Sequence, residues 1–172
     1  RDVYFRNNGR INPGDIDSAG TLNMTLSGGN GLMFQNNGVY EWEVGDPATF
    51  DQIAVDGNVN FDSTWILRLS EAAGAVGGVD PSDTFDIITH TGTLADGLQS
   101  YVIDGSAIAG NTLWDISGAT LTAVPGAIQL SGIEFELANF NDVYTWDDGD
   151  AGDSNWATAP NWDLGGDPAT PP

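Results

Sequence analysis

The stretch VYEWEVGDPATFDQIAVDGNVNF, residues 39–61, decides the fold. It opens with Tyr40 and Trp42 alternating with Glu41 and Glu43, a period of two that places each row of side chains on its own face of a strand. A Gly-Asp-Pro segment breaks the alternation, and two short apolar runs follow on either side of an Asp-Gly turn. The stretch therefore predicts short β-strands joined by tight turns, and it contains no pattern that does chemistry.

The rest of the chain continues this pattern. Of 172 residues, 23 are glycine and 8 are proline, and the longest runs free of both, 58–73 and 133–148, alternate as strands do. Thr, Val, Ile and aromatic residues fill the segments between the breaks, so the sequence predicts an all-β fold of many short strands. Two architectures suit it, a β-solenoid (β-helix-like) or a two-sheet jelly-roll-type sandwich. No strict repeat period is visible, which weakens the solenoid alternative.

The composition changes after Trp146. Residues 147–172 are rich in Asp, Gly, Pro and Trp and poor in β-branched residues. We therefore predict a β-domain over residues 1–146 and an extended C-terminal tail or linker over residues 147–172. Because disordered tails seldom keep tryptophan, Trp156 and Trp162 suggest that this tail packs on something.

The charge is strongly acidic and unevenly distributed. The formal net charge is −21, and the basic residues are four arginines: Arg1, Arg6, Arg10 and Arg68. Such a chain repels nucleic acid and anionic membrane surfaces, and no apolar run approaches the ~18 residues of a membrane span. It needs counter-ions, which salt, calcium or a basic partner would supply. The abundance of Asp, Gly, Asn and Thr without cysteine favours an extracellular or cell-surface protein in its mature form after signal removal.

Several segments resemble a known class of protein. They are INPGDIDSAGTLNMTL (11–26), YEWEV (40–44), DQIAVDGNVNF (51–61), WILRL (65–69), DTFDIITHTGTL (83–94) and YTWDDGDAGDSNWATAPNW (144–162). In order and style they resemble the β-strand repeat regions of bacterial autotransporter-like and other large secreted surface proteins, such as adhesins and fibre proteins. The resemblance implies a secreted or surface-displayed stalk, passenger or fibre without an active site.

The residues that could support catalysis are either few in number or form no recognisable catalytic pattern. The single histidine, His90, lies at a predicted strand end, and no G-x-S-x-G nucleophile elbow occurs. The pairs Glu41/Glu43 and Glu134/Glu136 each occupy one side of an alternating strand. A glycosidase uses two such carboxylates, but with 25 acidic residues a solvated polar face is the favoured interpretation. We therefore predict no catalytic residue and no enzyme activity.

One acidic segment is a candidate calcium site. Calcium binds six to eight oxygens from a flexible loop, and closely spaced aspartates between glycines can supply them. The candidate ligands are Asp147, Asp148, Asp150 and Asp153. Their spacing does not follow the EF-hand, and a solvated acidic turn is the alternative. No cofactor is required, and calcium is the one candidate ion.

The leading hypothesis is a non-catalytic structural or adhesive subunit of a fibre or surface layer. Its copies would join by strand addition through the terminal segments, in head-to-tail contacts that give filaments. The predicted assembly residues are Val3, Tyr4, Phe5, Tyr144, Trp146, Trp156 and Trp162, since aromatic residues are enriched in subunit contacts. The alternative is a carbohydrate-binding module whose tail tryptophans stack on a glycan, and a carboxylate hydrolase is a more distant one.

Overall fold

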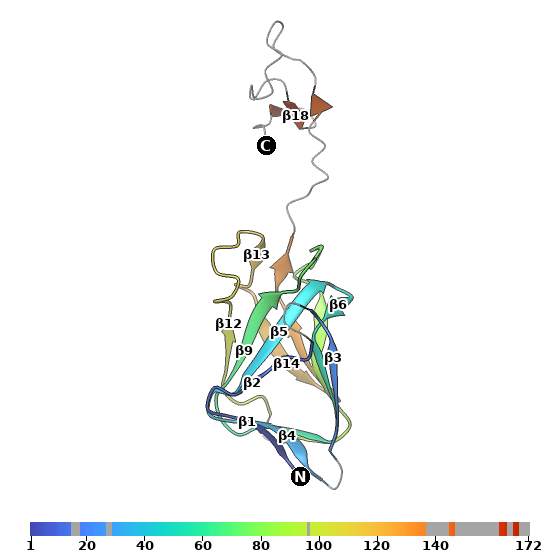
Figure 1. The fold of residues 1–172 in the computed structure, drawn as a ribbon, viewed down its shortest axis with the longest axis vertical. Coiled ribbons are helices and arrows are strands. Elements are labelled where there is room, and N and C mark those ends of the chain that lie inside the picture. The colour runs from blue at the N-terminus through green and yellow to red at the C-terminus, as the bar shows by residue number, and fades with distance from the viewer. Residues whose placement is uncertain are drawn as a thin grey trace, which may run out of the picture. The chain divides into compact units, whose positions relative to one another are not determined.

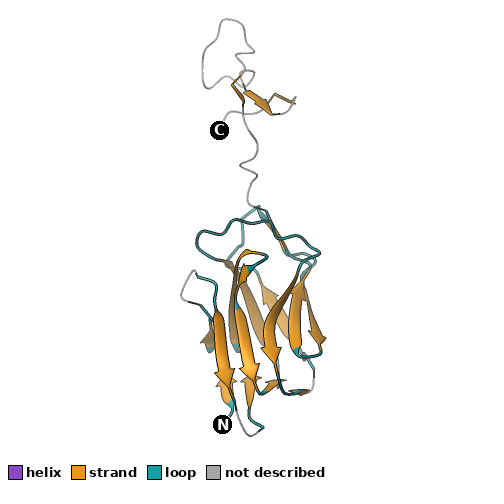
Figure 2. Cartoon of the chain, turned by 90° about the vertical axis from the view of Figure 1, so that its right-hand side faces the viewer, coloured by secondary structure: helices purple, strands orange, loops and turns teal. Residues whose placement is uncertain are grey.

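A computed structural model describes residues 1–14, 18–26, 29–95 and 97–136, together with the backbone of three short strands further on. This described part of the chain is all-β and contains no helix (Figure 2), as the sequence predicts. It follows that no helix among these residues is long and apolar enough to cross a membrane. The chain divides into two compact units, Arg1–Leu137 and Ala138–Pro172. The predicted boundary after residue 146 stays a prediction.

The first unit is built from three main sheets, and the chain visits them one after another, so that its first three strands lie in different sheets (Figure 1). The first sheet contains β1 (Val3–Phe5), β4 (Gly31–Phe34), β8 (Asn58–Phe61) and β11 (Leu94–Ala95). The second contains β2 (Arg10–Ile11), β5 (Val39–Asp46), β9 (Trp65–Glu71) and β12 (Tyr101–Asp104). The third contains β3 (Thr21–Thr25), β7 (Gln52–Asp56), β10 (Thr84–His90), β15 (Ala127–Ser131) and β14 (Thr120–Val124). Three short strands complete the unit, β6 (Thr49–Phe50), β13 (Trp114–Asp115) and β16 (Glu134–Phe135).

The strand pairing distinguishes between the two predicted architectures. Apart from the short strand β6, which pairs antiparallel with β5, every pair from β1 to β12 within the three main sheets is parallel, and each strand pairs with the strand one circuit of the chain later. A jelly roll is antiparallel, whereas a parallel pair needs a long crossover, which here is the path through the other two sheets. The strands from β1 to β12 therefore form a β-solenoid, and β15 and β14 add an antiparallel extension to the third sheet.

The sequence shows no strict repeat period because the structural repeat is present but uneven. The register partners Val3, Leu32, Val59 and Leu94 are separated by 29, 27 and 35 residues. The loops between strands differ in length from one coil to the next, so a fixed period does not show in the sequence. Each coil nevertheless returns the chain to the same three sheets.

The clearest repeat is a corner with the pattern F-x-N-N-G, at residues 5–9 and again at residues 34–38. Both asparagines of each copy have positive φ, between 46° and 63°. Two consecutive left-handed residues make a tight turn that asparagine adopts more readily than most residues. The Asn7 N–H donates to the Asn36 carbonyl at 3.0 Å, so the two corners stack directly.

The interior is a stack of large side chains that follows the coils. Phe34 lies 5.7 Å from Phe5 and 5.4 Å from Phe61, between ring centroids, and Phe61 stacks on Trp65 at 4.5 Å. Tyr40 and other inward residues of the middle coils are also fully buried. Burial of these apolar surfaces is the main stabilising contribution to a fold that has no disulfide.

Close approach of the coils makes one glycine essential. A Cβ at Gly38 would overlap the carbonyl oxygen of Phe5 in the preceding coil. We expect Gly38→Ala to lower the free energy of unfolding by about 1–3 kcal/mol, because the backbones of two paired coils must separate. Gly45→Ala is the matched control, since its Cβ would meet Ala75 and Thr49 no closer than 3.7 Å. Urea unfolding of both variants tests this, and equal losses would contradict it.

The second unit is described by its backbone pairing alone. It contains β17 (Thr145–Trp146), β18 (Trp162–Leu164) and β19 (Asp167–Pro168), which form one antiparallel sheet in that order. Trp146 and Trp162 are register partners across β17 and β18.

Candidate functional site

The first coil of the solenoid is a candidate assembly surface. Within the described chain, β1, β2 and β3 each pair on one side only. The inward side chains of β1 and β3 are only partly buried, whereas their register partners one coil later are completely buried or nearly so. Ile11 on β2 differs, because it is only 5% exposed. These partly buried side chains are Val3, Phe5, Leu22 and Met24. This end of the solenoid thus exposes both strand edges and part of the core.

The opposite end has the same character. The outermost described strands there are β11, β12 and β14. Leu94, Tyr101 and Ile103 pack against the core but remain partly exposed, and Val102 on β12 is 47% exposed. The middle coils, by contrast, are paired and covered on both sides. The two ends of the solenoid are therefore the surfaces on which a further coil would bury the most apolar area.

The predicted assembly residues fall into two groups. Val3, Tyr4 and Phe5 form the edge strand β1, in which Phe5 points toward Phe34 and Tyr4 is 47% exposed. The Tyr4 hydroxyl donates to Asp2 at 3.1 Å, and this carboxylate raises the Tyr4 pKa above its ordinary value. For the second group, Trp146 and Trp162 are described only as backbone, and Tyr144 and Trp156 lie outside the described residues. Their predicted roles stay predictions.

A ladder of alternating charges crosses the second sheet. An Arg10 Nη atom lies 2.7 Å from Glu41 Oε1, and an Arg68 Nη atom lies 3.3 Å from the same oxygen. Arg68 Nε also lies 2.9 Å from Asp104 Oδ2. We refer to Arg10, Glu41, Arg68 and Asp104 as the charge ladder. Half-exposed ion pairs contribute little stability each, but their alternation favours one register of the coils over others.

A buried carboxylate connects the coils from inside. Asp51 has no exposed surface, and its side chain accepts the Gly20 N–H at 2.7 Å and the Glu43 N–H at 3.1 Å. Its backbone carbonyl accepts the Trp42 indole N–H at 2.8 Å and the Tyr40 hydroxyl at 3.2 Å. Burial raises the Asp51 pKa to about 7, although the hydrogen bonds from the Gly20 and Glu43 N–H groups lower it. Sequence reasoning missed this residue, although an aspartate directly before the apolar strand β7 was its signal.

One member of the two acidic pairs does not lie on the solvated face that the sequence suggested. Glu43 is only 5% exposed, and the side-chain amide of Asn12 lies 3.4 Å from one of its oxygens. The expectation is therefore wrong for Glu43, because the segment after β2 covers this part of β5. Glu41 belongs to the charge ladder. Glu134 is half-buried and Glu136 is exposed.

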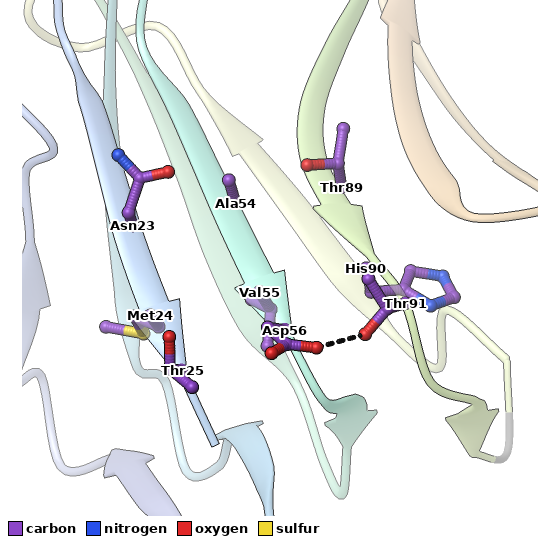
Figure 3. Close-up of a pocket in the computed structure, with 9 residues that line it drawn as sticks. All are labelled: Asn23, Met24, Thr25, Ala54, Val55, Asp56, Thr89, His90 and Thr91. Carbon is purple, nitrogen blue, oxygen red and sulfur yellow. Dashed lines mark hydrogen bonds between the residues drawn. The ribbon is translucent and has the colours of Figure 1, made fainter. Parts of the chain in front are cut away.

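His90 borders a shallow hollow of about 270 Å³ across β3, β7 and β10 (Figure 3). The hollow is lined by residues of the three strands and by the residue after β10: Asn23, Met24, Thr25, Ala54, Val55, Asp56, Thr89, His90 and Thr91. His90 Nδ1 lies 2.9 Å from the Gly92 carbonyl oxygen. The Thr91 hydroxyl donates to Asp56 at 2.8 Å. This hydroxyl and carboxylate therefore pair with each other and not with the imidazole, so the three groups do not form a catalytic triad.

The candidate calcium ligands Asp147, Asp148, Asp150 and Asp153 lie outside the described residues, so this site stays a prediction. Among the residues that are described, no three acidic or histidine side chains are grouped so as to hold a metal ion.

Comparison with known proteins adds no assignment, because no family model and no curated protein sequence matches the chain.

Proposed function

We propose that this chain is a non-catalytic structural or adhesive extracellular protein, a subunit of a fibre or surface layer whose copies join by strand addition. The observation that carries the proposal is the pair of solenoid ends, each with strands paired on one side only and with partly exposed core residues. Unpaired strand edges are templates for another strand, and each coil of a solenoid needs a neighbour on both sides.

The composition supports an extracellular setting. A net charge of −21 keeps separate copies soluble and directs them toward cations or basic surfaces. The resemblance to β-strand repeat regions of secreted surface proteins points to the same class of function.

The third sheet offers a direct test of strand addition. Gln52 N–H donates to the Gly20 carbonyl and Leu26 N–H donates to the Asp56 carbonyl, so even-numbered residues from 20 to 26 face β7. The Asn23 N–H therefore points to the open edge of β3. Proline is tolerated at such an edge position but removes the donor. We expect Asn23→Pro to raise the concentration needed for self-association about tenfold or more, and Asn23→Thr to leave it unchanged.

Light scattering over a concentration series and negative-stain electron microscopy, with calcium and with a chelator, give the readout. Association of the unsubstituted protein that is lost only in the proline variant supports the proposal. A chain that stays monomeric at every concentration in both conditions overturns it. Monomers that bind a glycan array would favour the carbohydrate-binding alternative in its place.

A further inference from the structure

One row of side chains in the second sheet is covered at its first strand and exposed at its last strand. Register pairing places Arg10, Val39, Ile66 and Val102 in a single row across β2, β5, β9 and β12. Val39 has Arg10 as its register partner on one side and is 2% exposed, whereas Val102 at the other end of the row is 47% exposed. The strand that carries Arg10 lies beside Val39, and an arginine side chain can cover apolar surface with its aliphatic stem. An arginine in the same position beside Val102 would cover that side chain.

The charge ladder indicates that the side chain covering Val102 would be Arg10 of a second copy. Its signs alternate from Arg10 through Glu41 and Arg68 to Asp104, so the two ends of the sheet carry opposite charges. Arg10 is two register positions from Glu41 and reaches it diagonally. Placed beside Val102, Arg10 of a second copy would stand in the same diagonal relation to Asp104. Contact between two first coils would instead bring Arg10 against Arg10.

Strand direction agrees with this arrangement in all three sheets. The outer strands of one end are β1, β2 and β3, and those of the other end are β11, β12 and β14. Within the first two sheets the pairs that connect successive coils are all parallel. In the third, β10 and β14 both run antiparallel to β15, so β14 has the direction of β10, β7 and β3. A second copy can therefore continue the first two sheets in parallel, while the third sheet already extends one strand further through β14, which has the direction of β3.

We propose that a second copy of this chain docks its first coil on the last coil of its neighbour, head to tail, with β2 pairing in parallel with β12 and Arg10 of one copy bound to Asp104 of the other. The inference rests on the proposed function and specifies its partner, polarity and register. Because this contact joins two different surfaces, it does not close on itself and it yields a filament.

Two substitutions with the same change in charge test the contact. Arg10→Glu and Arg6→Glu both lie in the first coil and both lower the net charge by two, but only Arg10 belongs to the charge ladder. The Arg6 guanidinium lies over the Tyr4 ring, 5.9 Å from its centroid. We expect Arg10→Glu to weaken association about tenfold or more at low salt, and Arg6→Glu to stay close to the unsubstituted protein. Arg10→Gln is a second variant in case Arg10→Glu disturbs the first coil by repelling Glu41. It should also weaken association.

A mixing experiment tests the polarity. Arg10→Glu leaves the last coil intact, and Asp104→Asn leaves the first coil intact while its amide oxygen can still accept the Ser106 N–H. Each variant alone should stay largely monomeric, and an equimolar mixture should form 1:1 dimers without filaments. If Asp104→Asn alone associates like the unsubstituted protein while Arg10→Glu does not, a head-to-head contact overturns the inference.

The outcomes separate the two proposals. If the unsubstituted protein never associates, the proposed function fails. If it associates but Arg10→Glu and Arg6→Glu behave alike, self-assembly stands and the Arg10–Asp104 contact is wrong.

Discussion

Phe34→Ala is expected to lower the free energy of unfolding by about 3–5 kcal/mol. Phe34 has no exposed surface, and its ring lies within 5.7 Å of Phe5 and 5.4 Å of both Phe61 and Trp65, measured between centroids. Truncation removes the centre of this stack and leaves a cavity between coils. The coils cannot collapse into it readily, because β4 is held on both sides by β1 and β8.

Urea unfolding followed by tryptophan fluorescence measures the loss. Tyr4→Ala is the matched control, since it removes an aromatic ring from the neighbouring strand β1 at a position that is 47% exposed. We expect the control to cost less than about 1 kcal/mol. A similar small loss for Phe34→Ala would show that the aromatic stack does not contribute as the packing indicates.

Much of the fold follows from local pattern. The alternation of Tyr40 and Trp42 with Glu41 and Glu43 predicts a strand with two distinct faces, and residues 39–46 form β5 with both aromatic side chains buried. A period of two fixes which side chains share a face, because successive residues of a strand point to opposite sides. It does not fix which strands pair, so the solenoid and the sandwich could not be separated from alternation alone.

The repeated corner was the missing evidence. Residues 5–9 and 34–38 share the pattern F-x-N-N-G, and these corners stack. The recurrence of Asn-Asn-Gly is a signal of stacked corners that does not depend on one fixed period. In the next coil, residues 62–64 stand where the asparagines would be, and the Thr64 carbonyl accepts the Asn37 N–H at 2.8 Å. The Asn-Asn-Gly pattern is therefore absent from this corner, although the corner still stacks on the preceding one.

The candidate site depends on contacts between residues distant in sequence. Arg10 and Glu41 are 31 positions apart, and so are Gly20 and Asp51. Neither the charge ladder nor the burial of Asp51 can be derived from composition, because both require knowledge of which coil lies beside which. The concentration of arginine in the first ten residues was visible in the sequence, and its partner strand was not.

Asp51 makes a second large effect testable, a dependence of stability on pH. Burial raises its pKa from an ordinary value near 3.8 to about 7. Well below pH 3.8 the carboxyl is protonated in both the folded and the unfolded states. As the pH rises from 4 to 7 the unfolded chain loses this proton first, so the folded state loses stability throughout this range, about 4 kcal/mol in all. Above pH 7 both states are ionised and the contribution is constant.

Urea unfolding at half-unit intervals from pH 4 to pH 8 measures this dependence, with Asp51→Asn to remove the titrating group. The amide keeps one acceptor for the Gly20 N–H but cannot accept the Glu43 N–H at the same time, so we expect a loss of about 1–3 kcal/mol near pH 4. Its stability should then vary much less with pH, so the two curves should cross between pH 4 and pH 7 and the variant should be the more stable of the two at pH 7. Asp62→Asn removes the same charge at an exposed position and should keep the slope of the unsubstituted protein. If Asp51→Asn kept that slope as well, the pH dependence would arise from general repulsion among the carboxylates and not from Asp51.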